Sequence, residues 1–235
     1  GFVICAEGDY LGLGTGEQLV RRVTELRIEA ARHANPLTFL PGNIPISDHI
    51  CRLLAGGGRF AACYCDLNHF KPFNDYYGYW RGDEMIRLAA KTMTANCDPL
   101  RDFVGHVGGD DFILLMQSGD WEWRCRRIID EFNFQARAFY DESARARGGI
   151  EGEDSRGNMR FFAFTTISIG AIDVGPGDFS RHEDVASAAA SARRSARKTP
   201  GGLLVCGPPA CRCDDDPGTG RRGNVGAPTL RTIAS

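Results

Sequence analysis

The most distinctive stretch of this chain is His106-Val107-Gly108-Gly109-Asp110-Asp111-Phe112, in which two glycines and two adjacent carboxylates lie between apolar residues. Phe103 and Val104 precede it, and Ile113-Leu114-Leu115-Met116 continues it. Apolar runs on both sides of a Gly-Gly pair predict a β-hairpin. Two carboxylates at its tip repel each other, and a hard cation would remove that cost. The pattern is therefore typical of a metal-assisted phosphoryl-transfer site.

Length and composition limit the possible classes of protein. The chain has 235 residues, enough for one large domain or for a domain with a fragment. Its net charge of -2 excludes a global basic field of the kind that binds nucleic acid or an anionic membrane. No apolar run approaches the roughly 20 residues of a membrane helix, and residues 1–10 lack the pattern of a signal peptide. We therefore expect a cytoplasmic protein, and the missing initiator Met suggests a fragment or an excised domain.

The nine cysteines are expected to be mostly buried, reduced thiols. Five of them fall in or beside predicted strands and helices: Cys51, Cys63, Cys65, Cys97 and Cys125. A second group, Cys206, Cys211 and Cys213, lacks the paired C-x-x-C spacing of a zinc site. Binding of a soft metal by this second group remains an open alternative.

Hydrophobic periodicity predicts the order of the elements. We expect strands at residues 1–5, 10–13, 60–65, 161–174 and 203–206, the last at a sheet edge, and helices from 15 or 16 to about 33 and at 47–54, 70–77, 83–95, 121–142 and 186–198. Ser47 is a candidate N-cap. Residues 143–158 are expected to form a loop or a hairpin, and residues 207–235 a disordered tail.

A second group of polar residues follows the strand predicted at residues 60–65. Asp66 ends that strand and could share a Mg²⁺ ion with the hairpin carboxylates, although an Asp there could equally cap the next helix. Lys71 and the free backbone N–H groups of that helix could hold phosphate. Asn74-Asp75 and Gly82-Asp83 follow. An Asn and an Asp on one face can hydrogen-bond the edge of guanine.

The combined pattern resembles the GGDEF family, the diguanylate cyclase domain. The resemblance extends over about residues 35–205. It rests on these motifs: 35–43 (Asn-Pro-Leu-Thr-Phe-Leu-Pro-Gly-Asn), 66–75 (Asp-Leu-Asn-His-Phe-Lys-Pro-Phe-Asn-Asp), Gly78, Gly82-Asp83, Gly108-Gly109-Asp110-Asp111-Phe112 and Ser168-Ile169-Gly170.

The resemblance implies an α/β (α+β) fold like that of nucleotide cyclases and polymerase palms. Its central sheet would be mostly antiparallel and flanked by helices, with the active site on a β-hairpin. Two such domains, each holding one GTP and Mg²⁺ or Mn²⁺, would meet head to tail as a homodimer. They would condense two GTP into cyclic di-GMP and two pyrophosphates. The expected domain occupies residues 35–206.

The resemblance also implies roles for single residues. The metal-binding positions are Asp66, the backbone carbonyl of Leu67, and Asp110. The guanine-binding positions are Asn74, Tyr79 and Asp83. The phosphate-binding positions are Phe70, Lys71, Gly108, Gly109 and Arg197, with Lys198 as an alternative to Arg197. Asp110 and Asp111 are the catalytic residues, and Asp110 is the best candidate to help deprotonate the attacking hydroxyl.

Several residues depart from the family pattern. Asp111 stands where the family has Glu, so its carboxylate is shorter by roughly 1 Å, a displacement that can cost on the order of 100-fold in rate. Asn68 replaces a second Asp, and Tyr79 replaces a His. The family's inhibitory product site is expected to be absent, because Pro99 stands in place of its Arg, although Asp102 is retained.

Residues 1–16 resemble the end of a CBS-type module of an EAL–CBS–GGDEF protein, with residues 17–34 as a connector helix. Three functions are compatible with the sequence. The first is an active diguanylate cyclase. The second is a degenerate, non-catalytic module that binds GTP and regulates a neighbouring EAL phosphodiesterase domain. The third is a palm-like enzyme with another nucleotide product, which the expected guanine contacts argue against.

Overall fold

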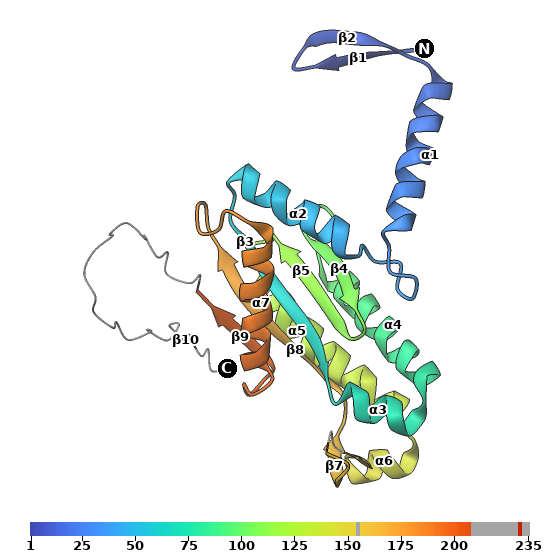
Figure 1. Cartoon of the computed structure of the whole chain (residues 1–235), viewed down its shortest axis with the longest axis vertical. Helices are drawn as coiled ribbons and strands as arrows, with labels where there is room; N and C mark the ends of the chain where they lie inside the picture. The colour runs from blue at the N-terminus through green and yellow to red at the C-terminus, as the bar shows by residue number, and fades with distance from the viewer. Residues whose placement is uncertain (154–155, 208–229, 232–235) are drawn as a thin grey trace, which may run out of the picture.

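The computed structural model describes residues 1–153, 156–207 and 230–231 (Figure 1). The helices are α1 (Gly16–Arg32), α2 (Asn43–Gly56), α3 (Phe70–Tyr77), α4 (Tyr79–Asn96), α5 (Trp121–Ala136), the 3₁₀ turn η1 (Arg137–Phe139), α6 (Glu142–Arg147) and α7 (His182–Ala196). The strands are β1 (Phe2–Ala6), β2 (Asp9–Gly14), β3 (Phe60–Asn68), β4 (Phe103–Gly108), β5 (Asp111–Met116), β6 (Gly149–Glu153), β7 (Met159–Ala163), β8 (Thr166–Val174), β9 (Leu203–Cys206) and β10 (Leu230–Arg231).

One large sheet organises the domain, in the order β10-β9-β8-β3-β5-β4. Its pairs are antiparallel except for β8 with β9, which run parallel. This architecture confirms the predicted mixed α/β fold with a mostly antiparallel sheet. In Figure 1, α2 and α7 cover one face of the sheet, and α4 and α5 cover the other.

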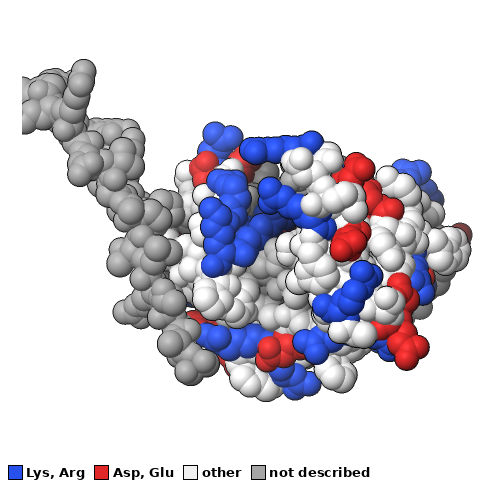
Figure 2. Space-filling model, turned by 90° about the horizontal axis from the view of Figure 1, so that it is seen from below, with Lys and Arg blue, Asp and Glu red and all other residues white. Residues whose placement is uncertain are grey.

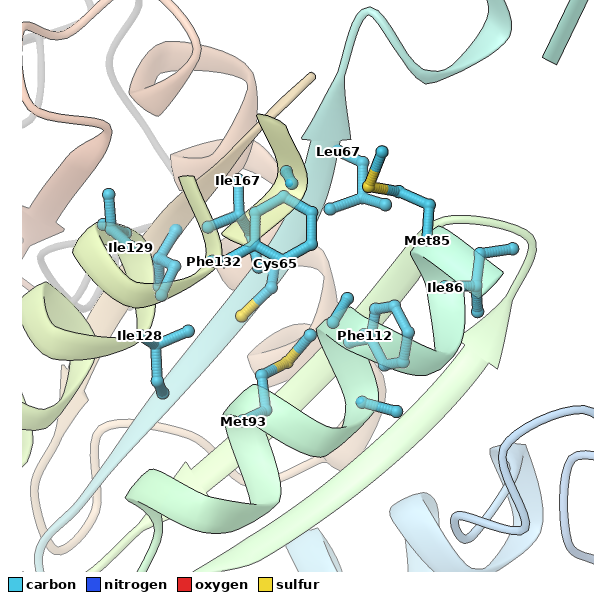
Figure 3. Packing of buried hydrophobic residues seen from close by; sticks show 14 of the residues in the cluster. Cys65, Leu67, Met85, Ile86, Met93, Phe112, Ile128, Ile129, Phe132 and Ile167 are labelled. Atoms are coloured by element: carbon cyan, nitrogen blue, oxygen red, sulfur yellow. The ribbon is translucent and has the colours of Figure 1, made fainter. Parts of the chain in front are cut away.

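The central strand β3 is buried on both faces, as its apolar sequence predicts. One face packs against α4 and α5, and Figure 3 shows Cys65, Phe112 and Ile167 of the sheet meeting Met93 and Phe132 of these helices. The other face packs against α2 and α7. Because side chains alternate along a strand, Asp66 points to the second face, next to α7.

Helix α7 lies unusually close to the sheet at Gly170 of β8. A Cβ atom at Gly170 would clash with the backbone of Ala192 and Arg193. Gly170 pairs with Tyr64 across the ladder, so the helix backbone passes beside the Tyr64 ring. The absence of a side chain at Gly170 therefore sets the height of Arg193 above the sheet.

Some predicted boundaries were wrong, each for a local reason. Helix α2 begins after Gly42, not at Ser47, because Pro45 is tolerated in a first helical turn. Helix α4 includes Gly82 and begins at Tyr79, and α7 begins at His182. The strand at 203–206 is flanked by β10, so it is not the sheet edge, and β10 lies within the predicted tail.

The helix expected over residues 121–142 breaks after Ala136. Tyr140 turns inward and its hydroxyl accepts a hydrogen bond from the backbone N–H of Thr165, at 2.8 Å. Asp141 then caps a new helix, α6, by accepting from the N–H of Ala144. The same contact at Thr165 divides the strand predicted over 161–174 into β7 and β8. Residues 149–153 pair with β7, so the segment after α6 is a hairpin.

The N-terminal hairpin and α1 extend away from the sheet (Figure 1). Thr15 caps α1 through a capping box, but no residue of this helix is buried. Its apolar residues Leu19, Val23 and Leu26 are exposed, as are Val3 and Leu13 of the hairpin. These residues therefore add nothing to the core of the domain.

The prediction of buried thiols is confirmed for Cys63, Cys65, Cys97 and Cys125, whereas Cys51 is exposed. The Sγ atoms of Cys63 and Cys125 are 3.9 Å apart, and burial raises the pKa of the Cys65 thiol. Cys211 and Cys213 lie outside the described residues. No helix in the described part of the chain is long and apolar enough to cross a membrane.

The packing of α7 on Gly170 yields a testable expectation. Gly170→Ala should lower the free energy of unfolding by about 1–3 kcal/mol, because the new methyl group forces the helix backbone away from the sheet. Urea denaturation measures this. Gly56→Ala is the control: its Cβ meets nothing within 4 Å, so it should be neutral or stabilise the domain by up to about 1 kcal/mol. Equal effects of the two substitutions would contradict the packing argument.

Candidate active site

The predicted hairpin is present, with Gly109 and Asp110 at its tip. Gly108 pairs with Asp111, which closes a two-residue connection between β4 and β5. Gly108 and Gly109 have φ values of 150° and 58°, a region that favours glycine. The two glycines thus allow the tight turn that brings Asp110 to the end of the sheet.

A buried histidine holds this tip in place. The Nε2 atom of His106 lies 3.0 Å from the carbonyl oxygen of Gly109, and its Nδ1 atom lies 2.9 Å from the hydroxyl of Thr38. A carbonyl only accepts, so Nε2 donates and Nδ1 accepts from Thr38. Burial lowers the pKa of His106, which agrees with this neutral form. Sequence reasoning missed this role.

Two carboxylates face each other across the central ladder. Asp66 on β3 is directly opposite Asp111 on β5, and its side chain is only 2% exposed. Like charges in direct opposition destabilise a sheet. A cation is therefore required at this position for the two carboxylates to remain ionised.

Two arginines from α7 and its C-terminal end supply that positive charge. One terminal nitrogen of Arg193 binds both Asp66, at 3.0 Å, and Asp111. The Nε of Arg197 donates to the other oxygen of Asp66, at 2.5 Å. We call Asp66, Asp111, Arg193 and Arg197 the ion-pair cluster. Asp66 is thus not the helix cap considered from sequence, since His69 occupies the N-cap position of α3.

The ring of Tyr64 supports Arg193 from below. The guanidinium carbon lies 4.9 Å from the ring centroid, within the range of a cation–π contact. Tyr64 precedes Asp66 by two residues, so both point to the same face of β3. The Nε of Arg193 is buried and has no hydrogen-bond partner among the described residues. The guanidinium therefore gives up hydration that its ion pairs do not fully replace.

A pocket of 340 Å³ opens beside the cluster. It brings together five of the predicted site residues, namely Leu67, Phe70, Lys71, Asp110 and Arg197. His69, Pro72, Glu153 and Phe162 complete its lining. Gly108 and Gly109 do not line it. Figure 2 shows Lys and Arg side chains gathered around a hollow on the face seen from below, which suits a polyanionic ligand.

The predicted guanine contacts lie on α3 and α4, outside this lining. The Oδ1 of Asn74 is buried without a partner in the described structure, against Gly82. A side chain at Gly82 would displace it. Asp83 follows at once and is half-buried, whereas the side chain of Tyr79 is 78% exposed. An unsatisfied buried acceptor is a group that a ligand's N–H could satisfy.

Asn68 departs from the family pattern and Asp102 matches it, and both side chains form hydrogen bonds within the domain. The side-chain amide of Asn68 donates to Thr166, at 3.0 Å, and its oxygen accepts from Ser168. The Asp102 carboxylate accepts from the backbone N–H groups of Asp98, Gln117 and Ser118 and from the Ser118 hydroxyl. Asp102 therefore holds the loop before β4, and Pro99 beside it is exposed.

Electrostatics distinguish the two hairpin carboxylates. Burial, followed by repulsion from Asp66, raises the pKa of Asp110 to about 6. Burial also raises the pKa of Asp111, although Arg193 opposes that change. Among the described residues Asp110 has no salt-bridge partner, and it lines the pocket. It is available to a cation or to a proton.

Arg193 is the main residue that sequence reasoning missed. Near the end of α7 the sequence pattern indicated only Arg197 or Lys198, yet Arg193 makes the bridging contact between the carboxylates. A usable signal was present, because residues four apart on a helix share a face, which places Arg193 beside Arg197. The sequence also contains Gly170, whose lack of a side chain lets α7 pack close to the sheet.

The fold and site define a class: an α/β domain with a mostly antiparallel sheet and an acidic hairpin tip beside a pocket that Lys71 and Arg197 help to line. Residues 33–138 match a family model described as "Diguanylate cyclase, GGDEF domain". Over these residues the chain is therefore similar to a GGDEF domain. This is the family that the motifs indicated.

Curated relatives agree with this result over a limited segment. The bifunctional diguanylate cyclase/cyclic di-GMP phosphodiesterase MucR of Pseudomonas aeruginosa is 36% identical over 104 residues, which are 43% of this chain and 15% of that protein. The signaling protein YkoW of Bacillus subtilis is 29% identical over 117 residues, 46% of this chain and 14% of that protein. The chain thus corresponds to a small part of each relative.

Solved structures support the fold. Diguanylate cyclase SiaD of P. aeruginosa, in complex with its activator SiaC, has a TM-score of 0.60 at 20% identity, covering 80% of this chain and 67% of that one. The coiled coil and GGDEF domain of DgcB from Caulobacter crescentus, in complex with c-di-GMP, has a TM-score of 0.55 at 19% identity, covering 80% and 94%.

The raised pKa of Asp110 predicts a pH-dependent stability. Between the usual value of 3.8 and about 6, the folded protein holds a proton that the unfolded chain has released. Stability from this group is therefore present at low pH and lost as pH rises through 6. With chelator present, wild type should lose stability relative to Asp110→Asn between about pH 4 and 6, as measured by urea denaturation.

Asp141 provides a control of opposite sign. Hydrogen bonding to the N–H of Ala144 lowers the pKa of its carboxyl. Its contribution should therefore be present at neutral pH and disappear as pH falls below about 4. A difference between wild type and Asp110→Asn that stays constant with pH would contradict the burial of the Asp110 charge.

Proposed function

We propose that this domain is a diguanylate cyclase, which condenses two GTP into cyclic di-GMP and two pyrophosphates. The observation that carries the proposal is the convergence of Asp66, Asp110 and Asp111 beside a pocket that also contains Lys71 and Arg197. The match to the GGDEF family model supports the same reaction. The domain would act as a head-to-tail homodimer, with one GTP in each half.

The residues present suit a divalent cation. Asp66, the Leu67 carbonyl and Asp110 offer hard oxygen ligands, and Mg²⁺ usually takes one or two carboxylates together with water and substrate phosphate. In the described part of the chain, no three His, Cys, Asp or Glu residues form a metal cluster by themselves. We therefore expect Mg²⁺ or Mn²⁺ to bind weakly to Asp66 and Asp110 by itself, and more tightly once the phosphates of the nucleotide complete its ligands. The ion would neutralise charge that develops on the reacting phosphate.

The other residues would position the substrate. Lys71, Arg197 and the first turn of α3 would bind phosphate oxygens, since they line the pocket. Asn74 and Asp83 would hydrogen-bond guanine at the α3–α4 junction. The 3′ hydroxyl of one GTP attacks the α-phosphate of the other, its proton passes to the Asp110 carboxylate, and the bond to pyrophosphate breaks. A pKa of about 6 leaves Asp110 mostly ionised at neutral pH and suited to this role.

A second candidate function also has a specific observation behind it. Asp111 replaces the family's Glu, and its carboxylate is bound by Arg193. A site whose acidic residues are already neutralised could bind GTP without turning it over. The domain would then be a non-catalytic module that regulates a neighbouring EAL phosphodiesterase domain.

We further propose that α1 connects the GGDEF domain, over residues 35–206, to other domains of a longer protein. Its exposed apolar residues Leu19, Val23 and Leu26 support this role. The β1–β2 hairpin would belong to an upstream module, for which a CBS-type module is our proposal. Dimerisation through these segments would raise the local concentration of the second half-site.

One assay separates the two functions. Purified chain at high concentration is incubated with GTP and Mg²⁺ or Mn²⁺, and cyclic di-GMP and pyrophosphate are measured. We expect both products, and a loss of about 100-fold or more in Asp110→Asn. Tight binding of GTP with no product would favour the regulatory module.

Guanine recognition is tested on α4. Asp83→Ala should weaken GTP binding by about tenfold through loss of a hydrogen bond, without changing the affinity for Mn²⁺ alone. Calorimetric titration measures both. Glu84→Ala, at the adjacent exposed position, is the matched control and should leave GTP affinity unchanged. Equal binding of ATP and GTP by the wild type would show that the guanine assignment is wrong.

A further inference from the structure

The ion-pair cluster occupies the position that the proposed metal site requires. Both oxygens of the Asp66 carboxylate are bound to guanidinium groups, one to Arg193 and one to Arg197. With a side chain that is 2% exposed, Asp66 has no other open direction of approach. A cation that binds Asp66 must therefore displace at least one arginine contact.

Releasing Arg193 would free an oxygen atom of both carboxylates, whereas releasing Arg197 would free only one oxygen of Asp66. Arg193 bridges Asp66 and Asp111, the two facing carboxylates, whereas Arg197 contacts Asp66 alone. Arg193 is also anchored from behind, because its backbone lies on Gly170 and its guanidinium on the ring of Tyr64. Because Gly170 holds the backbone against the sheet, displacing this guanidinium requires a change in the Arg193 side chain and not in the helix.

While Arg193 bridges the two carboxylates, one of its buried nitrogen atoms has no hydrogen-bond partner among the described residues. This atom is Nε, and a buried donor without a partner has a free-energy cost. Arg197, by comparison, uses its Nε in a hydrogen bond with Asp66. The hydrogen-bonding capacity of Arg193 is thus used less completely than that of Arg197.

We propose that Arg193 is a resident counterion that competes with the divalent cation for Asp66 and Asp111. This inference rests on the proposed metal site. In the ligand-free domain the guanidinium neutralises the facing carboxylates and keeps the sheet intact. Arrival of a divalent cation replaces one positive charge by another, so the carboxylates never face each other uncompensated. The contact is thus autoinhibitory, and it raises the cation concentration that the domain needs.

The test measures binding of Mn²⁺ alone to the full chain, by electron paramagnetic resonance, without nucleotide. Removing the competitor in Arg193→Gln should raise the affinity for Mn²⁺ by about tenfold or more, the range expected for losing a charge-assisted hydrogen bond. Arg193→Lys keeps the charge but loses the planar guanidinium that stacks on Tyr64, and should give a smaller increase. The Lys variant also serves if Arg193→Gln fails to fold.

Arg194→Gln is the matched control. Arg194 is exposed and its guanidinium donates to Ser191 rather than to a carboxylate, so its loss should leave Mn²⁺ affinity unchanged. Asp66→Asn should abolish binding in every background. Equal affinities in wild type, Arg193→Gln and Arg193→Lys, with binding still lost in Asp66→Asn, would overturn the competition while leaving the metal site standing. If Mn²⁺ bound Asp66→Asn as tightly as wild type, both the competition and the proposed metal site would be overturned.

Discussion

The structure depends on the opposition of Asp66 and Asp111 across the central ladder. Two carboxylates in direct register repel each other, so this pair persists only with a cation beside it. The neighbouring residues supply that positive charge and hold it in position. Gly170 admits α7, Tyr64 supports the guanidinium, and Arg193 and Arg197 reach the carboxylates. Removing either arginine would leave part of the carboxylate charge without compensation.

The same arrangement leaves one carboxylate of the hairpin, that of Asp110, outside the ion pairs. Asp110 stands at a turn that His106 holds through the carbonyl of Gly109. Its charge is disfavoured by burial and by Asp66, which leaves it able to accept a proton or to help bind a cation. Under the proposed function, the proton acceptor is therefore the carboxylate that forms no salt bridge with Arg193 or Arg197.

Much of this could be predicted from sequence because it depends on local patterns. The Gly108-Gly109 pair predicts the hairpin, and the apolar run Phe60–Cys65 predicts the buried central strand. The break after Ala136 could not be predicted, because it depends on Tyr140 reaching Thr165, 25 residues away. Arg193 was missed for a similar reason, since it lies 127 residues from Asp66 and acts only once α7 has packed on the sheet. Long-range contacts of polar side chains leave little trace in periodicity.

The most direct test of this account is a crystal structure of the domain with Mn²⁺ and a non-hydrolysable GTP analogue. We expect the cation on Asp66 and Asp110, with the Arg193 guanidinium no longer bonded to Asp66 and the backbone of α7 unmoved on Gly170. A structure in which Arg193 still bridges Asp66 and Asp111 while the nucleotide and its cation bind elsewhere would contradict the account.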